Sequence, residues 1–267
     1  MEKTVECQIG VHHLFIEFKS AYGGIYREKL FGDMMEFGVP PNLIRLVKRS
    51  MTNVQCSVRI QSHLSEPIST TCGVRQGDAL ACLEKFIRDS GIQTRGTIFF
   101  KTVQILAYAD DIDLIARTAL GLNETFLNLK KSARNMGLVI NQEKTVYVYS
   151  GKDRTLHQDL AIGNDVFKRG DSFKYLGTMV NKMNNSSVEV NARLIMVNRA
   201  YYGLQNCMKS RNISRNVKTL HYKTLIGPVL TYGAETWVLS EQDEHCLSIF
   251  ERKILRRIYG PVIDGGR

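Results

Sequence analysis

The chain has 267 residues, of which 43% are hydrophobic and 23% charged, with 21 Gly and only 5 Pro. This length and composition are typical of a globular protein with one large domain or two smaller ones, and they exclude a disordered chain. The formal net charge of +10 favours a polyanionic partner, either nucleic acid or an anionic membrane surface.

No apolar run approaches the roughly 18 residues that a membrane-spanning helix needs, and the N-terminus has no signal-peptide pattern. The six cysteines are scattered without a Cys-x-x-Cys pair, which favours free thiols over a zinc site or a disulfide framework. We therefore expect a soluble intracellular protein, in the nucleus or the cytoplasm, with no membrane partner. The sequence carries no signal for its oligomeric state.

The first predicted element is a strand over residues 13–18, in which Leu14, Ile16 and Phe18 share one face. Glu17 lies on this apolar strand, where burying a carboxylate is costly unless something pairs with it. Helices are predicted over residues 26–37 and from Pro41 to about residue 50. Residues 54–60 then alternate like a half-exposed strand that pairs with 67–71 through a turn around 62–65.

The next segment, Gly73-Val74-Arg75-Gln76-Gly77-Asp78-Ala79-Leu80, has glycines on both sides of an arginine and a glutamine. Glycine permits close approach of the backbone to a ligand, and an arginine can bind a phosphate. An ordinary turn into a helix has the same pattern, so the segment alone leaves both interpretations open.

The most informative stretch is Leu106-Ala107-Tyr108-Ala109-Asp110-Asp111-Ile112-Asp113-Leu114. A strand over 103–108 and a second over 112–116 predict a tight hairpin with Asp110 and Asp111 at its tip. Adjacent ionised aspartates repel each other, so the pair persists most easily where divalent cations neutralise it. The alternative for an isolated pair is a polar turn, but two apolar arms favour a metal site for phosphate chemistry.

A regular apolar stripe follows at Leu122, Phe126, Leu129, Ala133 and Met136, and predicts an amphipathic helix that Gly137 ends. A helix between strands at this spacing suits an α+β fold. A short hairpin is predicted near 162–167 in an irregular loop, and residues 181–187 are a candidate linker.

The rest of the chain is predicted to be helical, with stripes over 194–208 and 247–258 and a helix over 217–232 that Pro228 interrupts. Residues 191–257 contain 11 Lys and Arg against 5 Asp and Glu, a net charge of 11 − 5 = +6. A basic helical bundle suits binding to the phosphates of a duplex, and the alternative is a solvated basic surface.

Five segments together resemble, in order, motifs A to E of the reverse transcriptases of non-LTR (LINE-type) retrotransposons. They are Phe15-Ile16-Glu17-Phe18-Lys19-Ser20-Ala21-Tyr22, the glycine-flanked segment from Gly73, the Tyr108-Ala109-Asp110-Asp111 core, residues 138–145, and residues 173–178. Residues 232–237 also match a C-terminal segment of that family, so the resemblance covers roughly residues 14–262. It implies a right-hand polymerase with an α+β palm over 1–180, built on an antiparallel sheet, a helical thumb over 181–267, and fingers largely absent.

The resemblance also implies the roles of individual residues. Two Mg²⁺ ions, with Mn²⁺ as an alternative, would be held by the catalytic carboxylates Glu17, Asp110 and Asp111. The substrate-binding residues would be Tyr22, Arg75, Gln76, Gly77 and Lys144, and Tyr175, Leu176 and Gly177 would hold the primer. Lys144 has an equally plain interpretation as a solvated lysine, and we expect Asp113 to support the hairpin. The implied partners are an RNA template, a DNA primer and deoxynucleoside triphosphates.

Three departures from the family pattern predict impaired activity. Glu17 replaces an aspartate, Gly23 replaces a second acidic residue, and the helix after residue 80 is about six residues short, a loss that we expect to displace it. One extra methylene moves a carboxylate by roughly 1 Å, which can cost about a hundredfold in rate. We therefore expect an N-terminally truncated, degenerate reverse transcriptase copy; the alternative is a non-catalytic nucleic-acid-binding remnant.

A metal-dependent nuclease built on the same carboxylates has little support, because no further acidic cluster or histidine pair accompanies them. His12 and His13 are neighbours on a predicted strand and therefore point to opposite faces.

Overall fold

The computed structural model describes residues 9–74, 81–92, 103–151, 158–183 and 185–260, without the side chains of 81–83. These residues form two compact units, Met1–Phe173 and Lys174–Arg267. The division therefore falls seven residues before the boundary at 180 and 181 that the sequence suggested. Each unit is described by itself.

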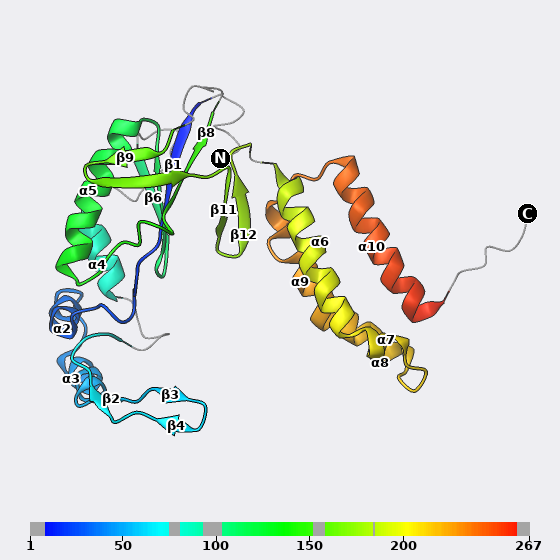
Figure 1. Ribbon diagram of the computed structural model, residues 1–267, viewed down its shortest axis with the longest axis horizontal. Helices are drawn as coiled ribbons and strands as arrows, with labels where there is room; N and C mark the ends of the chain where they lie inside the picture. Colours follow the sequence, from blue (N-terminus) through cyan, green and yellow to red (C-terminus); the bar gives the residue numbers. More distant parts are fainter. Residues whose placement is uncertain (1–8, 75–80, 93–102, 152–157, 184, 261–267) are drawn as a thin grey trace, which may run out of the picture. The chain divides into compact units, whose positions relative to one another are not determined.

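The first unit is built on a six-stranded sheet with the strand order β6-β7-β1-β8-β10-β9 (Figure 1). Its strands are β1 (Val11–Ile16), β6 (Val103–Tyr108), β7 (Asp111–Ala116), β8 (Val146–Ser150), β9 (Leu160–Ile162) and β10 (Asp165–Arg169). All neighbouring strands are antiparallel except β8 and β10, which are parallel. The parallel pair is possible because β9 runs antiparallel to β10 and lies between β8 and β10 in the sequence, so β10 again begins at the end of the sheet where β8 begins.

One face of the sheet carries the hydrophobic core. β1 lies between β7 and β8, and Leu14 pairs with Leu114 and with Tyr147 in adjacent strands. Helix α5 (Ala119–Asn135) covers this face with the stripe predicted from the sequence, and Leu122 and Phe126 are fully buried. The Thr118 side chain caps the start of α5 by accepting from the Gly121 N–H at 3.1 Å, a bond typical of an N-cap.

Helix α4 (Ala81–Asp89), which the sequence predicts to be about six residues short, also packs into this core. Phe86 of α4 is fully buried and lies edge-on to Phe18, with 5.9 Å between ring centroids. Contacts within the core therefore hold α4 against the sheet unit.

The opposite face of the two central strands buries a polar pair. His13 Nδ1 lies 3.0 Å from Asp113 Oδ2, and the two residues are only 2% and 4% exposed. The His13 ring stacks on Phe15, which stacks in turn on Phe173 at 4.5 Å. Asp113 thus ties β7, one arm of the hairpin, to β1.

Between β1 and α4 the chain forms a helical pair and a thin arm. Helices α2 (Arg27–Glu36) and α3 (Pro41–Met51) agree with the sequence prediction to within a residue at each end. The arm consists of two separate short pairs, β2 (Gln55–Cys56) with β5 (Ile68–Ser69) and β3 (Arg59–Ile60) with β4 (His63–Leu64). The predicted pairing of 54–60 with 67–71 is confirmed at β2 and β5, but the strand predicted over 54–60 is interrupted between Cys56 and Arg59, and its described strand residues are exposed rather than half-exposed.

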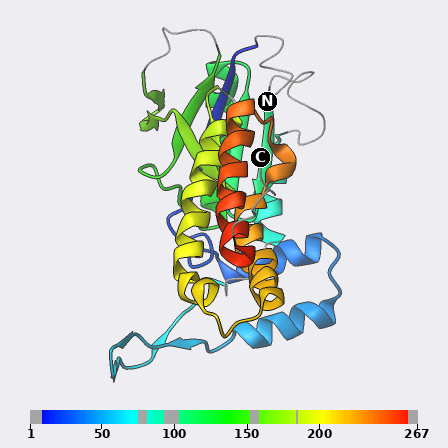
Figure 2. The same ribbon diagram turned by 90° about the vertical axis from the view of Figure 1, so that its right-hand side faces the viewer.

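The boundary between the units falls within β11 (Ser172–Tyr175), which forms a hairpin with β12 (Thr178–Asn181), and the second unit continues as helices. They are α6 (Ser186–Gly203), α7 (Gln205–Lys209), α8 (Arg215–His221), a π-helical turn (Tyr222–Ile226), α9 (Gly227–Thr231), a 3-10 turn (Ala234–Thr236) and α10 (Glu241–Tyr259). Figure 2 shows α6 and α10 side by side. Val197 and Tyr201 of α6 and Phe250 and Ile254 of α10 belong to one buried cluster. None of the described helices is long and apolar enough to cross a membrane.

The buried pair of His13 and Asp113 gives a test of this fold. Removing one partner leaves the other buried and unpaired, so we predict that Asp113→Ala lowers the free energy of unfolding by about 3–5 kcal/mol. Replacing both residues with leucine should recover much of this loss. Urea unfolding followed by circular dichroism measures the difference.

Asp165→Ala is the matched control, because Asp165 belongs to a more exposed ion pair with Lys130. It should cost about 1 kcal/mol or less. A loss for Asp113→Ala no larger than that of the control would contradict the role assigned to the pair.

Candidate active site at the end of strands β1 and β7

The hairpin of β6 and β7 turns through only two residues, Ala109 and Asp110, because Tyr108 pairs directly with Asp111. Ala109 has a φ of 52°, a left-handed conformation that residues other than glycine rarely adopt. Such strained positions cost on the order of 1–3 kcal/mol and cluster at functional sites. The strained turn fixes the two carboxylates of Asp110 and Asp111 at the start of β7.

Glu17 follows directly after β1, and its backbone is fixed by two hydrogen bonds. Its N–H donates to Thr145 Oγ1 at 3.3 Å, and its carbonyl accepts from the Asn141 N–H at 2.7 Å. The last pair of the β1–β7 register joins Ile16 to Ile112, so continuing that register places Glu17 opposite Asp111. The strand thus ends two residues earlier than predicted, because the chain beyond Ile16 pairs with the loop after α5.

The predicted carboxylates also affect one another electrostatically. Partial burial raises the pKa of Asp111, and the negative charges of Asp110 and Glu17 raise it further. Burial likewise raises the pKa of Tyr22, with additional contributions from Asp110 and Asp111. The structure therefore brings together four predicted site residues that are up to 94 positions apart (111 − 17) in the sequence.

Lys144 lies at the same place, with its Nζ 3.6 Å from Glu17 Oε2. The lysine side chain is 65% exposed and the glutamate side chain 36%, so this ion pair is weak and exchanges readily with solvent. Lys144 therefore lies at the candidate site. Its partner, Glu17, is the residue that replaces the aspartate of the family pattern.

Carboxylate oxygens are the hard ligands that Mg²⁺ and Mn²⁺ prefer, and a bound cation would relieve the repulsion that adds to the effect of burial at Asp111. The donor set of Glu17, Asp110 and Asp111 therefore fits a divalent ion in its chemistry. Within the described ranges, however, no three His, Cys, Asp or Glu side chains are gathered closely enough to hold a metal. The carboxylates are neighbours here without forming a closed ligand cage.

The loop that begins the motif B segment is attached to the same site. The Val74 N–H donates to the Tyr22 carbonyl at 2.7 Å, and the Gly73 N–H donates to the Ile25 carbonyl at 2.9 Å. Gly73 has a φ of +86°, and a Cβ there would lie 3.0 Å from the Gly23 carbonyl oxygen, so only glycine fits without strain. The predicted substrate residues Arg75, Gln76 and Gly77 follow immediately but lie outside the described residues.

Arg27 organises this loop, although the sequence reasoning did not single it out. Its guanidinium donates to the carbonyls of Gly73 at 2.7 Å, Met51 at 2.9 Å and Thr70 at 2.8 Å. A lysine could not bind these three carbonyls in the same way, because its ammonium group is a point charge without the planar, forked donors of a guanidinium. The sequence around Arg27 does not indicate this role, because the three acceptor carbonyls come from other segments of the chain.

The predicted primer-holding turn, Tyr175 to Gly177, belongs to the second unit. Arg193 of α6 donates to the Gly177 carbonyl at 2.6 Å and stacks over the Tyr232 ring at 4.6 Å. The Tyr232 hydroxyl donates to the Leu176 carbonyl at 2.8 Å. The segment 232–237, for which the sequence suggested no role, therefore supplies a residue that braces this turn.

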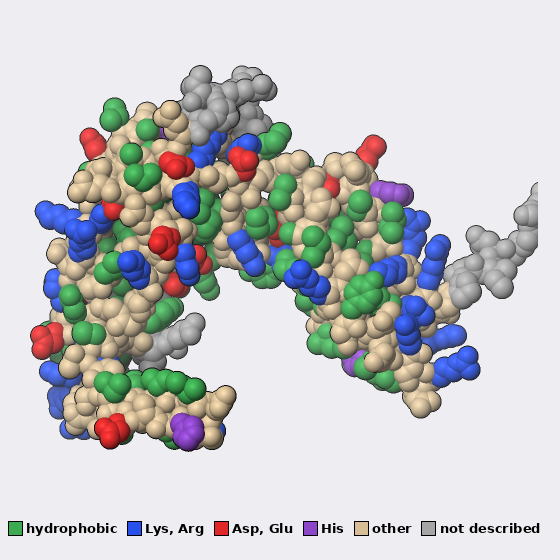
Figure 3. Space-filling model, in the orientation of Figure 1, with side chains coloured by type: hydrophobic (Ala, Val, Ile, Leu, Met, Phe, Trp, Pro, Cys, Tyr) green, Lys and Arg blue, Asp and Glu red, His purple; other side chains and the backbone are tan. Residues whose placement is uncertain are grey.

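Basic side chains gather on the exposed surface of the helical unit. Along α10, Arg252, Lys253, Arg256 and Arg257 are exposed, and Figure 3 shows Lys and Arg side chains over this helix and its neighbours. The surface matches the positive charge that the sequence predicted for this region, and it could contact phosphates.

Comparison with known proteins identifies the family. The model of the family described as "Reverse transcriptase (RNA-dependent DNA polymerase)" matches residues 5–180, about two thirds of the chain. The chain therefore belongs to the reverse transcriptase family, whose fold has a right-hand palm. The match contains every predicted site residue, from Glu17 to Gly177.

The similar proteins come from transposable elements. An uncharacterised transposon-derived protein of Caenorhabditis elegans is 26% identical over 58% of this chain and 56% of its own length. Pol polyproteins of the type-1 retrotransposable element R2 from Bradysia coprophila and Nasonia vitripennis are 26% and 22% identical, over 63% and 68% of this chain. The matches span only 21% and 19% of those polyproteins. The predicted resemblance to retrotransposon reverse transcriptases is thereby confirmed.

Solved structures give weaker likenesses. Apo telomerase from Candida tropicalis shares 14% identity over 68% of this chain and 36% of its own, with a TM-score of 0.43. Telomerase of the same organism in complex with a telomeric RNA fragment shares 12% identity over 94% of this chain and 44% of its own, with a TM-score of 0.42. The family assignment rests on the sequence match.

The raised pKa of Asp111 predicts how stability depends on pH. A carboxyl whose pKa is raised on folding binds its proton more tightly in the folded state, so stability falls as pH rises from the ordinary value of 3.8 through the raised one. We predict that Asp111→Asn melts at a higher temperature than the wild type at neutral pH, and that the two converge below pH 3.8.

Thermal melting across this pH range measures the effect, with Glu143→Gln as the control at an exposed carboxylate. Added Mg²⁺ should raise the melting temperature of the wild type and not that of Asp111→Asn. A wild type that is more stable than Asp111→Asn at neutral pH without metal would contradict the conclusion that ionised Asp111 destabilises the fold.

Proposed function

We propose that this chain is the polymerase portion of a retrotransposon reverse transcriptase, which extends a DNA primer on an RNA template with deoxynucleoside triphosphates. The observation that carries the proposal is the proximity of Glu17, Asp110, Asp111 and Tyr22, where β1 ends and β7 begins. The family membership of the chain supports the same reaction. Glu17, Asp110 and Asp111 would hold two Mg²⁺ ions, which supply activation of the primer hydroxyl and stabilisation of the leaving pyrophosphate.

The protein side chains would position the reactants around this centre. The Tyr22 ring, beside the carboxylates, would contact the sugar of the incoming nucleotide and disfavour a ribose hydroxyl by contact. The adjoining loop, which Arg27 braces at Gly73, would carry Arg75, Gln76 and Gly77 to the nucleotide and template. These three residues come directly after Val74, whose N–H donates a hydrogen bond to the Tyr22 carbonyl.

Proton and strand handling would fall to two other places. Lys144 could donate a proton to the departing pyrophosphate, and this requires release of its weak contact with Glu17. The turn formed by Tyr175, Leu176 and Gly177 would hold the primer, with Arg193 and Tyr232 keeping it rigid. The basic surface of α10 would bind the backbone of the duplex.

A second candidate function is nucleic-acid binding without catalysis. It is favoured by Glu17, whose side chain is one methylene longer than the family's aspartate and forms an ion pair with Lys144. In that case the basic helices would bind a duplex in a salt-dependent manner with no need for a divalent ion.

Primer extension on an RNA template separates the two functions. We predict that Glu17→Asp extends the primer about a hundredfold faster than the wild type, because it restores the shorter reach of the family's carboxylate. Asp110→Ala should abolish extension. Glu143→Asp, the same change at an exposed neighbouring position, is the matched control and should leave the rate unchanged.

Absence of extension in both the wild type and Glu17→Asp, together with retained salt-sensitive duplex binding, would contradict the polymerase and support the binding function. Equal extension rates for the wild type and Glu17→Asp would contradict the prediction that the extra methylene of Glu17 slows the reaction.

A further inference from the structure

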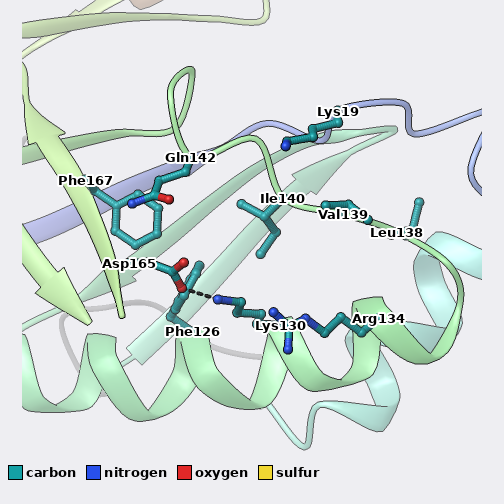
Figure 4. Close-up of a pocket in the computed structure, with 10 residues that line it drawn as sticks. All are labelled: Lys19, Phe126, Lys130, Arg134, Leu138, Val139, Ile140, Gln142, Asp165 and Phe167. Atoms are coloured by element: carbon teal, nitrogen blue, oxygen red, sulfur yellow. Dashed lines mark hydrogen bonds and ion pairs between the residues drawn. The ribbon is translucent and has the colours of Figure 1, made fainter. Parts of the chain in front are cut away.

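We propose that the first unit has a binding pocket for a phosphate group behind the candidate active site, between α5, the loop after it and β10 (Figure 4). The pocket is a cavity of about 210 Å³, roughly seven times the volume of one water molecule in the liquid. No role at this place follows from the polymerase proposal, and the pocket does not depend on catalytic activity.

The charges around the cavity favour an anion. Three cationic side chains line it, Lys19 from the segment after β1 and Lys130 and Arg134 from α5. The lining contains one carboxylate, Asp165, which forms an ion pair with Lys130. The described lining therefore has a net charge of 3 − 1 = +2, and Lys19 and Arg134 supply it.

The floor of the cavity strengthens the attraction. Phe126 and Phe167 line it as a fully buried edge-to-face pair with 5.0 Å between centroids. An apolar, low-dielectric wall reduces the screening of nearby charges and concentrates the positive potential. A phosphate, which is compact and carries several acceptor oxygens, suits two flexible cationic donors on opposite sides of such a cavity.

The walls are held in place by hydrogen bonds. The Lys19 N–H donates to the Val139 carbonyl at 2.8 Å, and the Gln142 side-chain amide donates to the Val166 carbonyl at 3.1 Å. In Figure 4, Lys19 extends from above the loop, and Lys130 and Arg134 lie along the helix below it. The pocket is therefore largely formed without a ligand, as binding sites commonly are.

The same segment joins the pocket to the candidate active site. Lys19 stands two residues after Glu17, and both are hydrogen-bonded through their backbones to the loop at Val139 and Asn141. A phosphate held between Lys19 and Arg134 would brace this segment against α5. The phosphate could belong to a nucleic-acid strand or to a free compound such as pyrophosphate.

Isothermal titration calorimetry of the full chain with inorganic pyrophosphate tests the pocket. EDTA keeps divalent ions away from the carboxylates, so the result does not depend on the polymerase proposal. We expect saturable binding that Lys19→Ala and Arg134→Ala each weaken about tenfold, since each removes one charged donor. Lys130 is left intact because its removal would leave Asp165 without its partner.

Lys131→Ala is the matched control, because Lys131 is exposed on α5, does not line the cavity and carries the same charge. It should leave binding unchanged. A wild-type dissociation constant weaker than about 1 mM, or equal losses in Lys131→Ala and Lys19→Ala, would overturn the site.

A single-stranded oligonucleotide distinguishes the two sources of phosphate. Loss of the pyrophosphate signal when the oligonucleotide is saturating would show that the pocket takes a strand phosphate. A signal that persists, and remains sensitive to Arg134→Ala, would show that it takes a free phosphate compound.

Discussion

The candidate active site depends on the pairing of β1 with β7. These antiparallel strands bring Glu17 opposite Asp111 only in the register that joins Leu14 to Leu114. A slip of one residue would turn every side chain of one strand to the other face, so it would bury charges and expose the core. Two features hold this register, the fully buried leucines on one face and the buried His13–Asp113 pair on the other.

The same pairing creates a conflict that the fold tolerates. Burial and two neighbouring carboxylates disfavour the ionised form of Asp111, and the turn before it places Ala109 in a left-handed conformation. Both features destabilise the folded chain, and both serve to present carboxylates at the end of a rigid sheet. A site that binds cations gains from this arrangement, because the ion relieves the repulsion that the strands impose.

Local patterns in the sequence were sufficient to predict many of the helices and strands. The strand 103–108 was predicted with its observed bounds because its apolar run leads into an obvious turn. The helix α5 followed from a stripe at regular spacing, and Gly137, with a φ of +83°, follows its end as predicted. The start of α10 could also have been found, because Ser240 and Asp243 form a capping box with the usual spacing.

What the sequence could not provide were contacts between distant segments. The Arg27 fork joins three carbonyls from different segments, and the His13–Asp113 pair spans 100 residues. No local pattern encodes either. The proximity of Asp110, Asp111 and Tyr22 was inferred from family resemblance, and their mutual electrostatics now support it. The roles of Arg75, Gln76 and Gly77 remain predictions.

We propose that Glu17, Asp110 and Asp111 act as one cation site. Electron paramagnetic resonance of Mn²⁺ tests this directly, because the signal of the free ion disappears when the protein binds it. We predict that the wild type binds Mn²⁺, that Asp110→Asn and Asp111→Asn each bind it about tenfold or more weakly, and that Glu143→Gln binds as the wild type does. Binding that is equal in all four proteins would contradict a cation site formed by these carboxylates.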